Sequence, residues 1–303
     1  MRVALTGGSG FIGSFIAKEA ARRGHRVTAL VRETSRRHHI EPFVDRFVVG
    51  DQADERAWGA LVEGADGLVH NSLDWRAARA AGLPGGAEFN ELLQRNLVAA
   101  LRLVRESAPL PVVFMSSIAV HHDMRPRWEG RPDEDHPLRP STDYGALKAA
   151  VEAYLWAEHF GSTPARHVAA VRPCAVYGID PNLPRSHGYA AIEAVRTGAP
   201  FTRRGGGKFV HVEDVALATL NALERPGASG LAFNLVDCYA RHADWARLAC
   251  EALGARVEID FSSPERPSNM FDTRRTREVL GVAMDRGHEG IRGHLRGLVA
   301  VMG

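Results

Sequence analysis

Tyr144 and Lys148 lie one helical turn apart in the stretch STDYGALKAAVEAYL. A phenol can transfer a proton, and an ammonium group one turn away can stabilise the phenolate that remains. An unperturbed phenol has a pKa of ~10, so proton transfer near neutral pH needs such electrostatic help. The same spacing also occurs by chance on the surface of amphipathic helices. The function of the pair therefore depends on the residues that accompany it.

A glycine-rich loop, TGGSGFIGS, directly follows the apolar run RVALT. Glycines at such positions allow a tight turn, close approach of the backbone to a pyrophosphate, and tight packing of a helix on a strand. The N-terminus of the helix that follows presents free N–H groups to phosphates. This context predicts a dinucleotide site, and its expected loop residues are Gly7, Gly10, Phe11, Ile12 and Gly13.

The choice of cofactor depends on the end of the second predicted strand. An Asp or Glu about 20 residues beyond the glycine loop usually holds the ribose of NAD, whereas this chain has Val31 followed by Arg32. Arg32, with Arg36 and Arg37 nearby, favours a 2′-phosphate. We therefore predict NADP as the preferred cofactor. NAD stays open, because Glu33 can turn toward the ribose and the arginines can form a solvated loop.

Composition limits the classes of partner. The chain has 303 residues, 45% of them hydrophobic, and 38 basic residues nearly balance 36 acidic ones. This balance predicts no strong attraction to nucleic acid or to an anionic membrane, so we expect a small-molecule substrate. Three widely spaced cysteines suit free thiols in a reducing compartment. No stretch of ~20 apolar residues could span a bilayer. A cytoplasmic location is the expectation.

Short β-branched runs alternate with helical patterns through the first two-thirds of the chain. Strands are predicted near residues 2, 26, 46, 67, 111 and 167, and helices over 11–23, 89–106 and 144–159. This alternation predicts an α/β fold, a doubly wound parallel sheet of the Rossmann type. Proline and glycine then gather over 181–188 and 198–207, which predicts a smaller C-terminal substrate lobe. The predicted division is 1–177 and 208–240 for the dinucleotide-binding domain, and 178–207 and 241–303 for the lobe, with RVEID expected as a strand.

Five motifs in the chain occur together and in order. They are TGGSGFIGS, the strand-end Ser117, YGALK at 144–148, RPCAVYG at 172–178 and FVHVEDVA at 209–216. In this combination the chain resembles the extended short-chain dehydrogenase/reductase family, the NAD(P)-dependent epimerase/dehydratase group. The resemblance covers residues 1 to about 220, with a looser match in PERPSNMFDTRRTREVLG.

The resemblance implies roles for individual residues. Ser117 matches the serine that hydrogen-bonds the reacting oxygen, and Tyr144 matches the general acid/base. Lys148 matches the residue that binds the nicotinamide ribose and lowers the tyrosine pKa. Asn96 matches an asparagine of the central helix. The implied activity is hydride transfer at a secondary alcohol or ketone carbon of a sugar or nucleotide-sugar, by a homodimer built from the helices that carry Asn96 and Tyr144.

Two departures from the family pattern bear on the activity. Ile118 and Ala119 stand where sugar 4,6-dehydratases have an Asp-Glu pair, which disfavours dehydration. Gly207, next to Lys208, lies near the place of an arginine that holds a nucleotide-sugar phosphate in epimerases. Two alternatives therefore stay open, an NADPH-dependent reductase of a small non-nucleotide carbonyl and a non-catalytic NADP-binding protein.

The remaining site predictions follow the strand ends and the lobe. Asp51 can accept from the adenine amine, or it can simply form a turn after its strand. His121 and His122 lack partners at metal-binding spacing, so no metal site is predicted. The further residues expected at the cofactor are Gln52, His70, Asn71, Asn96, Pro173 and Val176. Those expected at the substrate are Asp74, Trp75, Ser117, His187, Lys208 and Arg266.

Overall fold

A computed structural model describes residues 1–75, 87–121 and 131–303 of the chain. Its main sheet has the strand order β3-β2-β1-β4-β5-β6-β9, and every neighbouring pair is parallel. The predicted Rossmann-type fold and all six predicted strands are confirmed. The strands are β1 (Arg2–Thr6), β2 (Arg26–Val31), β3 (Arg46–Val49), β4 (Gly67–His70), β5 (Val112–Met115), β6 (Val168–Pro173) and β9 (Leu231–Leu235).

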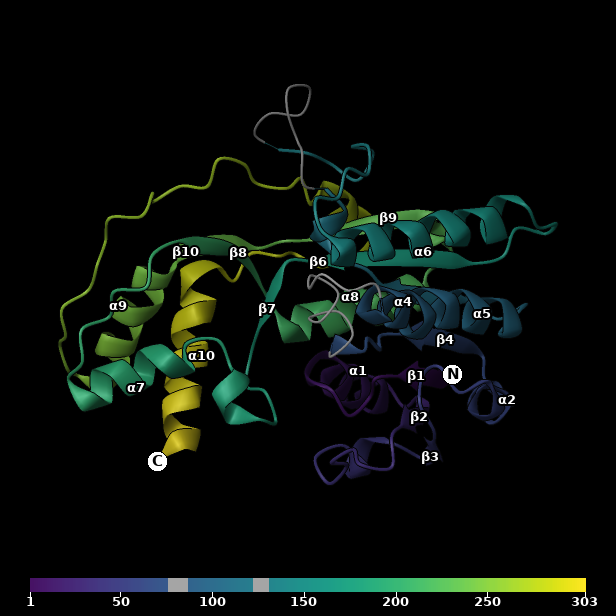
Figure 1. Ribbon diagram of the computed structural model, residues 1–303, viewed down its shortest axis with the longest axis horizontal. Helices are drawn as coiled ribbons and strands as arrows, with labels where there is room; N and C mark the ends of the chain where they lie inside the picture. The colour runs from purple at the N-terminus through teal and green to yellow at the C-terminus, as the bar shows by residue number, and fades with distance from the viewer. Residues whose placement is uncertain (76–86, 122–130) are drawn as a thin grey trace.

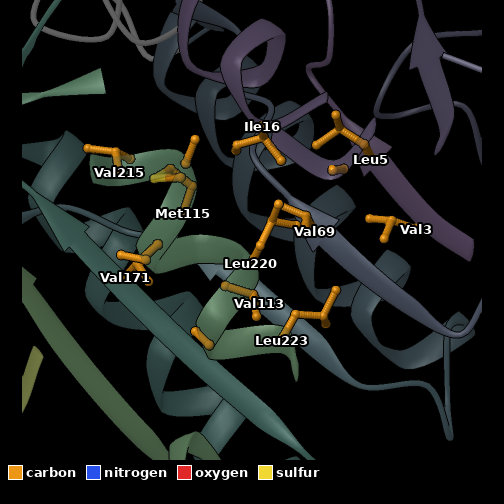
Figure 2. Packing of buried hydrophobic residues seen from close by; sticks show 14 of the residues in the cluster. Val3, Leu5, Ile16, Val69, Val113, Met115, Val171, Val215, Leu220 and Leu223 are labelled. Atoms are coloured by element: carbon orange, nitrogen blue, oxygen red, sulfur yellow. The ribbon is translucent and has the colours of Figure 1, made fainter. Parts of the chain in front are cut away.

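Helices cover both faces of this sheet (Figure 1). α1 (Phe11–Arg22) and α8 (Val212–Glu224) share one hydrophobic core with it, and α2 (Glu55–Val62), α5 (Ala99–Glu106) and α6 (Asp143–Phe160) share another. Figure 2 shows the first core, where Val69, Val113 and Val171 of three adjacent strands meet Val215 and Leu220 of α8. Strands buried on both faces need continuous apolar runs, which explains why β4 and β5 lack alternation.

The segment predicted as one helix over 89–106 is interrupted. α4 (Ala87–Leu92) passes into a turn of π-helix, η2 (Leu93–Val98), before α5 begins. π-helical turns of this kind often occur at functional sites, because the extra residue re-aims the side chains around it. Arg95 and Asn96 lie within the π-helical turn.

A second sheet organises the smaller lobe. β7 (Ala175–Tyr177) pairs parallel with β8 (Gly206–His211), which pairs antiparallel with β10 (Cys238–Arg241). Helices α7 (Tyr189–Thr197), α9 (His242–Leu253) and α10 (Gly287–Met302) gather beside it at the left of Figure 1. Tyr177, Phe209, Trp245 and Leu295 form part of its core. These strands lie on both sides of the predicted domain boundaries, and the division into domains remains a prediction.

The stretch RVEID at 256–260 is not a strand, contrary to expectation. Only an isolated bridge joins Ile259 to Phe201, and neither residue belongs to a strand. A β-branched pattern forms a strand only where a neighbouring strand offers a ladder of hydrogen bonds. Across the described ranges, no helix is both long enough and apolar enough to cross a membrane.

Candidate functional site

A cleft of about 990 Å³ runs along the carboxyl edge of the main sheet and reaches the smaller lobe. Gly7 after β1, Val31 at the end of β2, Asn71 after β4 and Ser117 after β5 line it, and His187 lines it from the lobe. Ligands of open parallel sheets bind at this edge, outside the ends of the strands. The site therefore lies where the fold predicts one.

The glycine loop has the geometry of a phosphate cradle. Gly7 has a φ of +69°, a conformation that side chains disfavour. A Cβ on Gly13 would lie 2.1 Å from the carbonyl oxygen of Gly7, so α1 packs against the loop only because residue 13 has no side chain. Gly10 caps α1 without a side-chain hydrogen bond, and the first turn has no acidic residue. The free N–H groups and the positive end of the helix dipole fit the diphosphate of NAD(P).

The loop after β2 forms the adenosine side of the cleft. Arg32 lines the cleft, and its backbone N–H donates to Ser35 Oγ at 3.1 Å. His39 lines it too, its ring bonds to the backbone of Ser9 in the glycine loop, and burial lowers its pKa. Most of this wall was not predicted from the sequence, because a polar loop carries no periodic signal. Its unexpected members are Thr34, Ser35, His38 and His39.

Helix α6 brings Tyr144 to the end of β5. A Cβ on Gly145 would lie 2.3 Å from the carbonyl oxygen of Ala119, so the glycine allows the start of α6 to approach η3 (Ile118–Val120) closely. Ser117 then makes a side-chain hydrogen bond to the Tyr144 phenol. Trp75 stacks on the Tyr144 ring, with centroids 5.5 Å apart and planes at 26°. The phenol thus lies in the cleft between a hydroxyl and an exposed indole.

Lys148 is buried below Tyr144, with 3% of its surface exposed. Its Nζ donates to the carbonyl oxygen of Met115 at 2.6 Å and lies 5.8 Å from the centroid of the Tyr144 ring. Burial lowers the pKa of Lys148 to about 7, although the Glu152 carboxylate opposes the change.

The net lowering of the tyrosine pKa that was expected from Lys148 is not found in this arrangement. Burial raises the pKa of Tyr144, and the hydrogen bond from Ser117 opposes this effect only in part. Burial is the larger effect, because the Lys148 ammonium hydrogen-bonds to the backbone of β5 and faces the phenol only from a distance, 5.8 Å from the centroid of its ring. Tyr144 is therefore a protonated phenol at neutral pH.

Arg95 of the π-helical turn joins the loops after β3 and β4. Its guanidinium bonds to Asp51 Oδ2 at 2.8 Å and to Asp74 Oδ2 at 2.6 Å. Both carboxylates line the cleft. Asp51 also accepts from the Ala53 N–H at 3.0 Å. It therefore forms a turn after β3, which was one of the two roles that the sequence suggested for it. The bridge fixes the chain immediately before Trp75.

Three residues expected at the cofactor lie one layer behind the cleft wall. Gly13 packs against the glycine loop. His70 is buried, its Nδ1 bonds to Thr6 Oγ1 at 2.9 Å, and burial lowers its pKa to about 3, so it is neutral. The Asn96 amide oxygen accepts from the N–H of Asp74 at 2.6 Å and from Gln52. Each of these residues supports the wall from behind and does not contribute to its surface.

The residues expected at the substrate divide in the same way. Asp74, Trp75, Ser117 and His187 line the cleft, whereas Lys208 and Arg266 do not. The Lys208 ammonium lies 5.7 Å from the centroid of the Phe271 ring, and Arg266 is exposed.

His187 lies at the lobe end of the cleft. Its ring packs between Phe209 and Trp245, at centroid distances of 5.3 and 5.8 Å, but keeps an exposed edge. Desolvation by the surrounding protein atoms, together with nearby His294 and Arg203, lowers its pKa to about 4. His187 is therefore a neutral group at the end of the cleft near neutral pH.

His122 lies outside the described residues.

The phosphate cradle, the strand-end serine and the Tyr144–Lys148 pair at one cleft define a nucleotide-dependent enzyme of the Rossmann class. The chain belongs to the NAD dependent epimerase/dehydratase family, whose model matches residues 3–235. The family resemblance found in the sequence is confirmed. The protein is thus an oxidoreductase or epimerase that depends on NAD or NADP.

Relatives in this family differ in their activities. The chain is 30% identical over 309 residues to a UDP-glucose 4-epimerase of Mycolicibacterium smegmatis, covering 93% of each chain. It is 29% identical over 268 residues to a 4-hydroxy-2-methyl-3-oxo-4-farnesyl-3,4-dihydroquinoline-1-oxide ketoreductase of Stigmatella aurantiaca, covering 86% of this chain and 75% of that one.

The fold is shared with solved structures. One is a UDP-glucose 4-epimerase of Thermus thermophilus in complex with NAD, with a TM-score of 0.76, 24% identity and 99% coverage of both chains.

Proposed function

We propose that the chain reduces the carbonyl group of a small, non-nucleotide ketone with NADPH as the hydride donor. The observation that carries this proposal is Tyr144, a protonated phenol that lies in the cleft and is hydrogen-bonded to Ser117. A proton donor beside the developing alkoxide is what carbonyl reduction requires of the protein.

The chemistry divides between the cofactor and three side chains. When bound, the reduced nicotinamide supplies the hydride, which goes to the carbonyl carbon. Ser117 donates a hydrogen bond to the carbonyl oxygen, and Tyr144 donates its proton to that oxygen as negative charge develops. The Lys148 ammonium, one turn along α6, then stabilises the Tyr144 phenolate until solvent returns the proton.

The composition of the cleft favours a substrate without a diphosphate. Trp75, Leu73 and Ala175 contribute apolar side chains to its wall. The two cations considered from the sequence for a diphosphate, Lys208 and Arg266, are absent from the described wall. Relatives named as ketoreductases, such as the one from Stigmatella aurantiaca, support the same proposal.

Epimerisation of a nucleotide-sugar is the second candidate function. Arg185 lines the cleft beside His187 and offers one cation for a phosphate. The relative from Mycolicibacterium smegmatis supports this alternative. Absorbance of the reduced nicotinamide separates the two functions: net oxidation of NADPH with a panel of ketones supports the reductase. Interconversion of UDP-glucose and UDP-galactose without net oxidation would overturn it.

We predict that NADPH binds more tightly than NADH, because Arg32 and Arg36 line the adenosine side of the cleft and Val31 stands where NAD sites usually have an acid. Replacing Arg32 by Ala removes one charge-assisted contact to a 2′-phosphate. The ratio of the two Kd values should fall by about tenfold, since such a contact contributes ~1.5 kcal/mol or more. Calorimetric titration with both cofactors checks this. Equal losses of affinity for NADPH and NADH would contradict it.

The homodimer is part of the same proposal. Tyr154 and Phe160 of α6 are 55% and 76% exposed, and α6 is one of the two helices expected at the interface. These two exposed apolar side chains on α6 are what the proposed interface would cover.

A further inference from the structure

A cluster of buried charged groups lies directly behind the Tyr144–Lys148 pair. Glu152 is completely buried on α6 and Arg172 is 2% exposed on β6. The Arg172 guanidinium donates hydrogen bonds to the Glu152 carboxylate from both Nε and Nη2, and the shortest of these contacts is 2.6 Å. Ser116 Oγ also donates to Glu152 Oε1. The proposed chemistry uses none of these three groups.

The cluster is continuous with the catalytic residues through the end of β5. Tyr144, Lys148 and Glu152 follow each other at intervals of four residues on one face of α6. The consecutive residues Met115, Ser116 and Ser117 each contact one of them. The Met115 carbonyl accepts from Lys148, Ser116 donates to Glu152, and Ser117 bonds to Tyr144.

His121 closes the far side of the cluster as a neutral group. Arg172 Nη1 donates to His121 Nε2 at 2.8 Å, so the proton of the imidazole lies on Nδ1, which donates to the Pro137 carbonyl at 3.4 Å. Burial and the charge of Arg172 lower the pKa of His121 to about 3. Arg172 is therefore the cation that faces the Glu152 carboxylate, and His121 adds no charge.

We propose that Glu152, held by Arg172 and Ser116, is a positioning residue that keeps Lys148 in its ammonium form and directed at the end of β5. The inference rests on the proposed function, in which Lys148 acts on Tyr144. The alternative is that Glu152 and Arg172 only fasten α6 to β6.

The charges around Lys148 give the direction of the expected effect. Tyr144 and Glu152 face Lys148 from α6, and the neutral His70 faces it from β4. The Met115 carbonyl faces it from β5, and Arg172 lies beyond Glu152 on β6. Glu152 supplies the negative charge and opposes the loss of the lysine proton. Without that charge Lys148 becomes neutral at lower pH.

The test compares pH profiles of kcat for four proteins, the wild type, Glu152→Gln, Glu152→Gln/Arg172→Met and Glu158→Gln. Activity that needs the Lys148 ammonium falls as pH rises through its pKa. Glu152→Gln should move this alkaline limb to lower pH by about one unit, since an opposite charge within one turn shifts a pKa by that much or more. The double variant should keep most of the shift. It removes both members of the Glu152–Arg172 pair, so neither is left as an unpaired buried charge, and it carries the test even if the single variant does not fold.

Glu158→Gln is the matched control. Glu158 also lies on α6 and pairs at 3.0 Å with a buried arginine, Arg166, but about 15 Å along the helix from Lys148. Its profile should match the wild type. Titration of the Lys148 ε-carbon by NMR, in protein labelled at lysine, measures the same pKa without turnover.

The outcomes separate the inference from the proposed function. The inference is overturned if the double variant keeps the alkaline limb of the wild type and its lysine titration is unshifted. Glu152 and Arg172 would then only fasten α6 to β6. A Tyr144→Phe enzyme that reduces ketones at the rate of the wild type overturns the proposed function instead. In that case the NMR titration of Lys148 still shows whether Glu152 raises the pKa of Lys148, because it does not require turnover.

Discussion

Replacing Tyr144 by Phe should lower the rate of carbonyl reduction by a factor of about 10²–10⁴, the usual contribution of a positioned general acid. The change removes one oxygen and leaves the ring that stacks on Trp75. It also leaves Lys148 hydrogen-bonded to Met115, so the fold of the site should persist. Initial rates of NADPH oxidation with a ketone substrate measure the effect.

Cofactor affinity is the control for this variant. Tyr144 contributes little to the glycine loop, and the Kd for NADPH should change by less than about threefold, or ~0.7 kcal/mol. Retained turnover in Tyr144→Phe would contradict the assignment of the phenol as proton donor. A loss of turnover that is explained by a loss of cofactor binding would contradict it too.

Replacing Gly13 by Ala should weaken cofactor binding by about 10- to 100-fold. The new Cβ would meet the Gly7 carbonyl oxygen at 2.1 Å and the Gly8 Cα at 2.8 Å. Both are backbone atoms of the phosphate cradle, so the cradle itself must move. Overpacking of this kind costs ~1–3 kcal/mol, and each 1.4 kcal/mol corresponds to about tenfold in affinity. Titration with NADPH measures the loss.

Gly59 offers the matched control, because it lies exposed in α2 with no atom within 4 Å of the place of a Cβ. Gly59→Ala should stabilise the protein by ~0.5–1 kcal/mol, since glycine disfavours a helix interior. Its affinity for NADPH should equal that of the wild type. An unchanged affinity in Gly13→Ala would mean that the loop does not form the cofactor cradle.

The parts of the fold that local patterns determine could be predicted from the sequence. The apolar runs of β4 and β5 fit only buried strands, and the glycine loop before α1 fits only a phosphate-binding turn. The fold followed from the alternation of such strands with helices. The second sheet could not be predicted. Its strand β7 has three residues, and such a strand depends on a partner distant in sequence. RVEID failed as a strand for the converse reason, the lack of a partner.

The site residues, too, could be predicted where they depend on local spacing and not where they depend on distant contacts. The Tyr144–Lys148 spacing is local, and so it was visible in the sequence. The hydrogen bond from Lys148 to Met115 joins α6 to β5 across 33 positions, and the burial that raises the pKa of Tyr144 likewise depends on tertiary packing. The Arg95 bridge from Asp51 to Asp74 likewise depends on three separate elements. Tertiary contacts of this kind have no signature in a single sequence.

Transfer of deuterium from labelled NADPH follows the proposed hydride step itself. The wild type is mixed with cofactor deuterated at the transferable position and with a panel of ketones, and the products are analysed by mass spectrometry. We expect alcohols that carry one deuterium on the former carbonyl carbon, and we expect Tyr144→Phe to form them about 10²–10⁴ times more slowly. Tight binding of NADPH with no labelled alcohol from any ketone would contradict the proposed reduction, as would equal labelling by the Phe variant.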